Sequence, residues 1–209
     1  MKIIKPSVEI ISNIDWNEAI HHIERCGRVC YKSEDKIAEG TAEQFIRNLI
    51  KRGHTSVLEH ISFTVKFIVD RGISHEIVRH RLASFSQEST RYCNYSMEHK
   101  FGSEITVIEP CFLEPGTKGY QRWAEACSDC EDAYFELLGW GCTAQEARNV
   151  LPHSLKAEIV MTADITEWRH FLRVRCNPAA HPQMREVATQ LLKICRESAP
   201  CLFDDILEG

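Results

Sequence analysis

The sequence has no basic surplus, no long apolar run and no second cysteine pair that could complete a zinc ribbon. Its 209 residues carry a formal net charge of −5, which argues against a general nucleic-acid-binding protein. No apolar run approaches the roughly 20 residues of a membrane span, and the N-terminus lacks the apolar stretch of a secretory signal. We therefore expect a cytoplasmic protein that binds neither membrane nor nucleic acid.

The ten cysteines do not predict a disulfide framework. Such frameworks are typical of small secreted domains, whereas this chain is long enough to bury a hydrophobic core without them. Cys127 and Cys130 form a Cys-x-x-Cys spacing, but it lies inside a helical pattern. We expect reduced thiols and no metal site.

Hydrophobic periodicity predicts helices and strands that are not regularly interleaved. Alternating apolar residues indicate strands at 1–11, 61–69 and 155–161. Residues 81–100 have no clear period and are interpreted as an ordered loop. We predict one α+β domain, residues 1–209. Helices are expected from Asp15 to about Cys26, from Thr41 with Gln44 as its capping-box partner, from Ser74 to His80, after Gly116, from Thr143 with Glu146, around Trp168 to Arg175, and from Met184 to Cys195. The helix after Gly116 has an apolar stripe that indicates core packing, formed by Tyr120, Trp123, Ala124, Cys127, Tyr134 and Leu137.

Arginine and hydroxyl side chains are concentrated in a short segment from Arg79 to Tyr92. Planar guanidinium groups with hydroxyls around them suit the oxygens of a phosphate. The alternative is a solvent-exposed arginine-rich turn whose charges pair with Glu76 and Glu88. The segment contains Arg79, His80, Arg81, Ser84, Ser86, Gln87, Ser89, Thr90, Arg91 and Tyr92.

A second polar cluster runs from His54 to His60, directly before the strand expected at 61–69. Ser56 lies where a helix N-terminus could accept a phosphate. The spacing of His54, Glu59 and His60 is not that of a His-Glu-x-x-His zinc site, so a metal is not expected there.

Arg79-His80-Arg81 is followed after seven residues by Ser89 and then by Arg91-Tyr92. This pattern closely resembles the signature of the flavin-dependent thymidylate synthases, and the resemblance covers most of the chain from about Arg28. The remaining matching positions are Gly53-His54, Ser56, Glu59-His60, Glu146-Ala147-Arg148, Leu151-Pro152, Trp168-Arg169-His170-Phe171, Arg175 and Ala180 to Ala188.

The resemblance implies an enzyme that makes dTMP from dUMP, with methylenetetrahydrofolate as the one-carbon donor. FAD relays reducing equivalents from NADPH, and tetrahydrofolate is released. The family fold is α+β, with a twisted, mainly antiparallel sheet flanked by long helices. Members assemble as homotetramers with active sites shared between subunits.

The resemblance also implies roles for individual residues. Arg175 is expected to be catalytic, by polarising the pyrimidine ring. Asp164 and Thr166 depart from the Asn and Arg of many relatives. Substrate-binding residues are expected to be Glu76, Gln87, Glu88, Ser89, Thr90, Arg91, Arg148 and Arg175. Cofactor-binding residues are expected to be His54, Ser56, Arg79, His80, Arg81, Gln87, Asp164 and His170.

Two alternatives remain within this interpretation. One is a related flavoenzyme that acts on another pyrimidine nucleotide. The other is a catalytically impaired homologue that still binds nucleotide or flavin, in which the departures at Asp164 and Thr166 would reflect lost activity. Arg175, Arg148 and the run from Ser89 argue against the second alternative.

Overall fold

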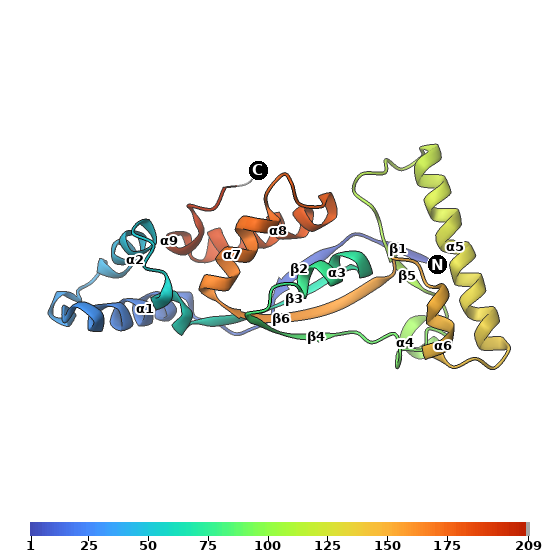
Figure 1. Cartoon of the computed structure of the whole chain (residues 1–209), viewed down its shortest axis with the longest axis horizontal. Helices are drawn as coiled ribbons and strands as arrows, with labels where there is room; N and C mark the ends of the chain where they lie inside the picture. The colour runs from blue at the N-terminus through green and yellow to red at the C-terminus, as the bar shows by residue number, and fades with distance from the viewer. Residues whose placement is uncertain (208–209) are drawn as a thin grey trace. The chain divides into compact units, whose positions relative to one another are not determined.

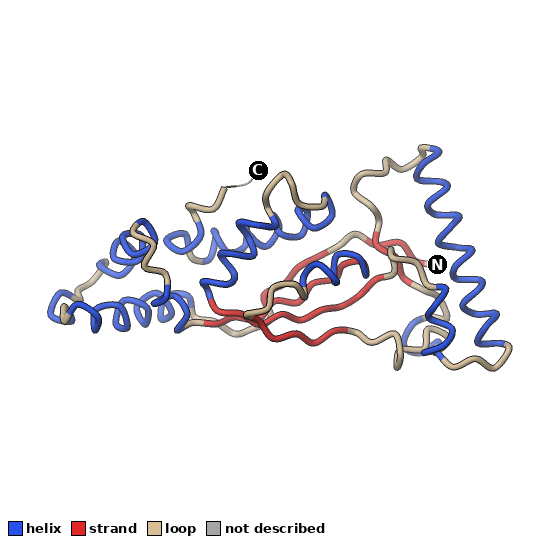
Figure 2. Tube along the Cα trace, viewed as in Figure 1, coloured by secondary structure: helices blue, strands red, loops and turns tan. Residues whose placement is uncertain are grey.

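The computed structural model describes residues 1–207, which form an α+β fold (Figure 1). Helices and strands are distinguished in Figure 2. The strands are β1 (Lys2–Ile4), β2 (Ser7–Ile10), β3 (Ser62–Asp70), β4 (Ala83–Gln87), β5 (Thr106–Ile108) and β6 (Lys156–Asp164). The α-helices are α1 (Trp16–Tyr31), α2 (Thr41–Lys51), α3 (Arg71–Ile77), α4 (Glu98–Phe101), α5 (Lys118–Gly139), α6 (Ala144–Ala147), α7 (Ile165–Arg175), α8 (Pro182–Ser198) and α9 (Pro200–Phe203). Short 3-10 helices occupy Glu34–Lys36, Ser56–His60 and Arg148–Val150.

The chain forms two compact units. Unit 1 comprises residues 1–7, 67–79 and 86–160, and unit 2 comprises residues 8–66, 80–85 and 161 onward. Strands β2, β3, β4 and β6 each supply residues to both units. The single domain expected over residues 1–209 stays a prediction.

The four-stranded sheet has the order β2-β3-β6-β4. Just past the end of β3, Arg71 N–H donates to the carbonyl of Leu155, next to the start of β6. Just past the end of β4, Glu88 N–H donates to Glu158 O, also near the start of β6. The end of each strand therefore meets the beginning of its neighbour, as in antiparallel pairing. β1 and β5 form a separate parallel pair, and the predicted fold class, α+β with a mainly antiparallel sheet, is confirmed.

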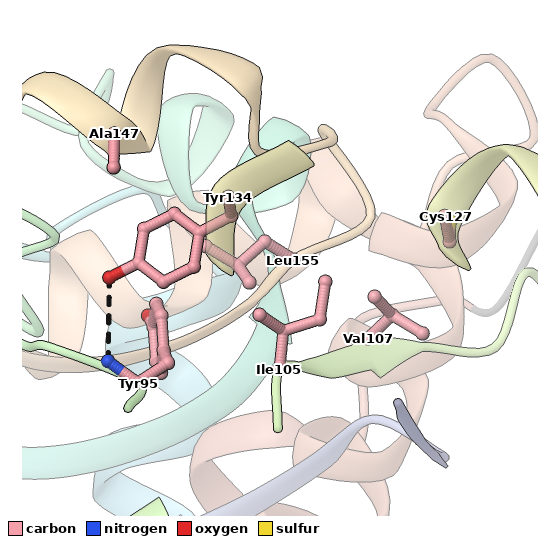
Figure 3. Packing of buried hydrophobic residues seen from close by; sticks show 7 residues of the cluster. All are labelled: Tyr95, Ile105, Val107, Cys127, Tyr134, Ala147 and Leu155. Carbon is pink, nitrogen blue, oxygen red and sulfur yellow. Dashed lines mark hydrogen bonds between the residues drawn. The ribbon is translucent and has the colours of Figure 1, made fainter. Parts of the chain in front are cut away.

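Unit 1 has a hydrophobic core to which α5 contributes Cys127 and Tyr134 (Figure 3). The Tyr134 hydroxyl accepts a hydrogen bond of 3.4 Å from the Tyr95 backbone N–H. This bond satisfies a buried donor without help from water. The apolar stripe predicted on this helix is therefore core packing. The other buried members are Ile105, Val107, Ala147 and Leu155.

Unit 2 is built around aromatic side chains from β3 and α7. Trp168 stacks on Phe63 with ring centroids 5.0 Å apart, and its Nε1–H donates to the Phe63 carbonyl at 3.1 Å. The alternation predicted for β3 is confirmed, because Phe63 and Val65 are both buried. This packing anchors the beginning of α7, the helix that carries Arg175.

The first helix is longer than the sequence predicts. Asp15 caps α1 as expected, but the helix continues to Tyr31 instead of ending near Cys26. Gly27 lies within the helix, and a Cβ at this position would lie 2.6 Å from Phe45 Cε1. The glycine serves the close approach of α1 and α2.

The capping box predicted for the second helix is wrong. α2 begins at Thr41, but its N-cap is Gly40. The Gln44 side chain donates to Asn48 instead of reaching back to the helix start. The second predicted capping box, Thr143 with Glu146, is confirmed at the start of α6.

Two expectations near the arginine-rich segment are also wrong. α3 begins at Arg71, with Asp70 as its N-cap, three residues before the predicted start. Residues 81–100 are not one loop, because they contain β4 and α4. β4 is the last strand in the sheet order and exposes Ser84 and Ser86. An edge strand with exposed serines has too little apolar character for periodicity to detect.

Candidate active site

His80 lies at the centre of a hydrogen-bonded group in unit 2. Its side chain is only 4% exposed. Nδ1 lies 3.1 Å from Glu167 Oε1, and Nε2 accepts a hydrogen bond of 3.0 Å from Arg175 Nε–H. The Phe171 ring packs against the imidazole, with centroids 4.8 Å apart. The structure thus links the expected catalytic residue, Arg175, to one of the expected cofactor residues.

The local sequence of α7 brings three of these side chains to one face. Phe171 follows Glu167 by four residues, and Arg175 follows by eight, so all three lie close to whole turns of a helix. Asp164 fixes the helix start, since its Oδ1 accepts the Glu167 backbone N–H at 2.8 Å. Arg175 is the last residue of α7, where the helix dipole favours a cation.

The protonation of His80 follows from its surroundings. Burial lowers the pKa of His80, the hydrogen bond to Glu167 opposes this change, and the nearby Arg175 lowers the pKa further. The imidazole is therefore neutral near pH 7. An arginine Nε–H can only donate, so Nε2 of His80 must be the unprotonated nitrogen. The proton lies on Nδ1, which donates it to the Glu167 carboxylate.

The remaining residues expected to bind the cofactor in unit 2 are mostly exposed. His54, Ser56, Arg81 and His170 all have exposed side chains. The His54 Nδ1 lies 2.9 Å from the Tyr31 hydroxyl. A guanidinium, a hydroxyl and imidazoles open to solvent are the kind of donors that an anionic diphosphate requires.

The two departures from the family pattern have structural roles. Asp164 is the N-cap of α7, a position for which aspartate and asparagine are equally suited. The Thr166 hydroxyl donates to the Thr55 carbonyl at 2.9 Å, just before the 3-10 helix that begins at Ser56. Contact of Asp164 with a cofactor stays a prediction.

Two residues expected to bind nucleotide meet in unit 1. Arg148 Nη1 donates to Thr90 Oγ1 at 3.3 Å, although they lie 58 residues apart. Thr90 is buried and Arg148 is exposed, so the hydroxyl tethers an accessible guanidinium. Arg91 is also exposed, with its guanidinium 5.3 Å from the Tyr92 ring centroid. The Ser89 backbone carbonyl accepts a hydrogen bond of 3.0 Å from the Tyr92 backbone N–H, which closes a turn.

Gln87 is held by a hydrogen-bonded chain on the α3 side. Its Nε2 donates to Ser74 Oγ at 2.9 Å, and Ser74 donates in turn to the Arg71 carbonyl at 2.9 Å. Glu76, on α3, is partly exposed, and Arg79 is exposed. All residues of the expected nucleotide set except Arg175 belong to unit 1. Arg79, which is expected to bind the cofactor, also belongs to unit 1.

Glu88 is part of an internal network. Its Oε2 lies 2.9 Å from Lys156 Nζ, and its Oε1 accepts a hydrogen bond of 3.3 Å from the Tyr95 hydroxyl. Burial raises the pKa of Tyr95, which keeps the phenol protonated as a donor. Glu88 and Lys156 line a pocket of about 390 Å³. The alternative in which Glu88 pairs with an arginine is wrong, because within residues 1–207 its ion pair is with Lys156.

Three of these partners were not predicted from the sequence. Ser74 and Lys156 lie in ordinary helix and strand patterns, and no sequence signal distinguishes them. Glu167 is different, because a carboxylate eight residues before Arg175 on an expected helix falls on the same face. That spacing is the signal that could have identified it.

His80, Glu167 and His170 also have the geometry of a metal-binding group, with ligand atoms within 4.8 Å of one another. Both ring nitrogens of His80 are already engaged, however, one of them by the Arg175 guanidinium. A metal would have to displace that cation or share the site with it, which is electrostatically unfavourable. The arrangement is better suited to orienting the guanidinium.

The expected Cys-x-x-Cys pair lies on α5. Cys127 and Cys130 form no disulfide. Burial raises the pKa of both thiols, so both stay protonated and poorly reactive near pH 7. Cys127 is part of the hydrophobic core of unit 1.

Comparison with known proteins identifies the family. The family model described as "Thymidylate synthase complementing protein" matches residues 13–201. A flavin-dependent thymidylate synthase from Geobacter sulfurreducens is 34% identical over 189 residues, covering 87% of this chain and 79% of that protein. The chain belongs to the flavin-dependent thymidylate synthase family.

A second member of the flavin-dependent thymidylate synthase family, from Corynebacterium aurimucosum, is 32% identical over 216 residues, covering 92% of this chain and 84% of that protein. The crystal structure of the UMP/dUMP methylase PolB from Streptomyces cacaoi, bound with 5-Br dUMP, superposes with a TM-score of 0.80. It covers 98% of this chain and 96% of that chain at 23% identity, and it confirms the fold. No helix within residues 1–207 is long and apolar enough to cross a membrane.

Proposed function

We propose that the chain is an FAD-dependent thymidylate synthase that converts dUMP to dTMP. Methylenetetrahydrofolate is the one-carbon donor, NADPH is the reductant, and tetrahydrofolate is the folate product. The observation that carries the proposal is the guanidinium of Arg175, held by the buried imidazole of His80 in a chain of this family. The names of the relatives and the dUMP analogue bound to the methylase of similar fold support it.

Arg175 supplies a fixed positive charge next to the pyrimidine. C5 of uracil is a poor nucleophile until electron density moves into the ring. A guanidinium at the N3/O2 side stabilises the negative charge that develops there, and such preorganised groups contribute about 3 kcal/mol. Because its Nε–H is bonded to His80, the charge needs little reorganisation during the reaction.

The nucleotide phosphate is bound by residues of unit 1. Arg148 and Arg91 have exposed guanidiniums, and guanidiniums bind phosphate oxygens with two parallel hydrogen bonds. Ser89 and Thr90 supply hydroxyl groups close to them in sequence. Ser89 serves as a hydrogen-bonding residue and not as a nucleophile. Glu76, Gln87 and Glu88 shape the remainder of the nucleotide site.

The residues of unit 2 fit a flavin with an anionic diphosphate. Arg81, Ser56, His54 and His170 are exposed donors, and we assign them to FAD binding together with His80. Arg79, Gln87 and Asp164 complete the assigned set. When bound, FAD supplies the redox chemistry that transfers reducing equivalents from NADPH to the one-carbon unit.

The proposal includes a cytoplasmic homotetramer with active sites shared between subunits. Sharing would allow the cationic residues of one chain to serve more than one site. Light scattering coupled to size-exclusion chromatography measures the number of subunits and so tests the tetramer. A monomer that turns over dUMP would contradict the shared site.

The activity is tested by product analysis of the purified protein with dUMP, methylenetetrahydrofolate, FAD and NADPH. We expect a yellow protein, formation of dTMP and tetrahydrofolate, and oxidation of NADPH that is faster with dUMP. A protein that takes up no added FAD would contradict the flavoenzyme assignment. A protein that binds FAD but methylates neither dUMP nor UMP would support the impaired homologue instead.

A second candidate is methylation of another pyrimidine nucleotide, which the methylase of similar fold favours, since its name includes UMP as well as dUMP. Competition between UMP and dUMP in the same assay separates the two. Higher kcat/KM for UMP would replace dUMP as the substrate without changing the assigned role of Arg175.

A further inference from the structure

Glu167 contributes more than a backbone N–H to the capping of α7. Its backbone N–H is bound by Asp164, while its side chain points to His80. The side chain is only 8% exposed. A buried carboxylate needs a hydrogen-bond donor or a positive partner, and within residues 1–207 the partner of this one is His80.

The identity of this partner determines the tautomer of His80. An ionised carboxylate can only accept hydrogen bonds, so Nδ1 of His80 must carry the proton that it donates. Nε2 is then a lone-pair acceptor, which is what the Nε–H of Arg175 requires. In the opposite tautomer, Nε2–H and the arginine Nε–H would be two donors facing each other.

The geometry of α7 allows both Glu167 and Arg175 to reach His80. Glu167 and Arg175 are eight residues apart, which corresponds to about 12 Å along the helix axis. Side chains on a helix lean toward its N-terminus, so the long arginine side chain can extend back toward the glutamate. His80 bridges the remaining distance, and Phe171 packs against its ring between the two contacts.

We propose that Glu167 is a positioning residue that acts through His80 to hold the guanidinium of Arg175 in the orientation used for the reaction. The proposal rests on the assigned role of Arg175 in turnover, and it adds a residue that touches neither substrate nor cofactor. The carboxylate fixes the His80 tautomer, the tautomer supplies the acceptor, and the acceptor fixes the arginine.

The choice of glutamate has a specific consequence. A glutamine at position 167 offers both a donor and an acceptor, so it permits either tautomer of His80. An alanine offers neither and leaves Nδ1 of His80 without the Glu167 acceptor. We therefore expect kcat to be highest with glutamate at position 167, lower with glutamine and lowest with alanine.

The first test reads the tautomer without turnover. Nitrogen NMR shifts of histidine-labelled, FAD-loaded protein distinguish a protonated from an unprotonated ring nitrogen, and the His80 signals are assigned with a His80→Gln variant. We expect protonated Nδ1 and unprotonated Nε2 in the wild type, and a mixture of tautomers in Glu167→Gln. Protonated Nε2 in the neutral wild-type ring would overturn the proposal.

The second test compares turnover and dUMP affinity in matched variants. Loss of a buried hydrogen-bonding partner predicts a decrease in kcat of about tenfold or more for Glu167→Ala, with partial recovery in Glu167→Gln and FAD absorbance retained. Glu24→Gln is the control, because Glu24 is another buried carboxylate of unit 2, bonded to Arg28. We expect this variant to lose stability but to keep the wild-type kcat.

A double-mutant cycle separates positioning from a general loss of packing. If Glu167 acts through Arg175, adding Glu167→Ala to Arg175→Ala leaves the calorimetric Kd of dUMP unchanged. A further increase in the Kd of dUMP when Glu167→Ala is added to Arg175→Ala would overturn the proposal. A kcat in Glu167→Ala equal to that of Glu24→Gln would also overturn it. If the wild type makes no dTMP, the proposed function fails, while the tautomer and the dUMP cycle still decide the role of Glu167.

Discussion

The two sets of expected site residues differ in how firmly the structure holds them. In unit 2, Arg175 is bonded to a buried imidazole that is itself bonded to a buried carboxylate. In unit 1, Arg91 and Arg148 are exposed, and a bond of 3.3 Å joins Arg148 to Thr90. A phosphate is already charged when it binds, so accessible cations are sufficient. A charge that develops only in the transition state is better met by a group that is fixed beforehand.

The largest effect is expected from removal of the fixed charge. Arg175→Ala should decrease kcat about a hundredfold or more, because it removes electrostatic help of about 3 kcal/mol, while the FAD absorbance remains. Steady-state formation of dTMP measures the effect. The control is Arg173→Ala, which removes an exposed arginine of the same helix that pairs with Asp205. Near-normal turnover in Arg175→Ala would transfer the activating role to another residue.

An intermediate effect is expected from the exposed cations of unit 1. Arg148→Ala should raise the KM for dUMP about tenfold, the loss typical of one charge-assisted hydrogen bond, with a smaller change in kcat. Arg122→Ala provides the control, since Arg122 is exposed on α5 and pairs with Glu125, three residues away on the same helix. If Arg148→Ala lowered kcat as strongly as Arg175→Ala does, the distinction between the two units would be lost.

A smaller effect, on folding stability, is expected when the pH falls and His80 becomes protonated. Burial lowers the pKa of His80 from its usual 6.5, so the unfolded chain takes up the proton first as pH falls. The stabilisation from the neutral imidazole is therefore complete above pH 6.5 and is lost as pH falls toward the lowered pKa. The charged and titratable groups that act on the imidazole are Glu167, Arg175 and His170, all on α7.

Thermal unfolding measured across this pH range should show the dependence. His80→Gln removes the titrating group and should flatten this part of the profile, whereas substitution of the exposed His153 by glutamine should leave it unchanged. The same slope in wild type and His80→Gln would show that other groups are responsible.

Sequence patterns predicted the parts of the fold that depend on neighbours along the chain. The alternation of Phe63 and Val65, the stripe on α5 and the capping box of Thr143 with Glu146 are local signals, and the structure confirms them. β4 was missed because it is a short edge strand that exposes Ser84 and Ser86.

The candidate site could be predicted only in part, for a related reason. Family motifs identify Arg175 and His80 as important, but they do not show that the two side chains are bonded across 95 residues. The bond between His80 and Glu167 spans 87 residues and depends on the packing of α7. Such contacts follow from tertiary structure, which periodicity and spacing do not specify.

The smallest effect is expected at Asp164, which starts the helix that carries the fixed charge. Asp164→Ala removes the acceptor for Glu167 N–H and should lower the free energy of unfolding by about 1 kcal/mol. Asp164→Asn keeps a capping side chain and should cost less. Chemical denaturation measures both variants, and FAD titration of the same samples shows whether the residue also contacts the cofactor. If Asn binds FAD more tightly than Asp at equal stability, the departure from the family pattern acts on the cofactor and not on α7.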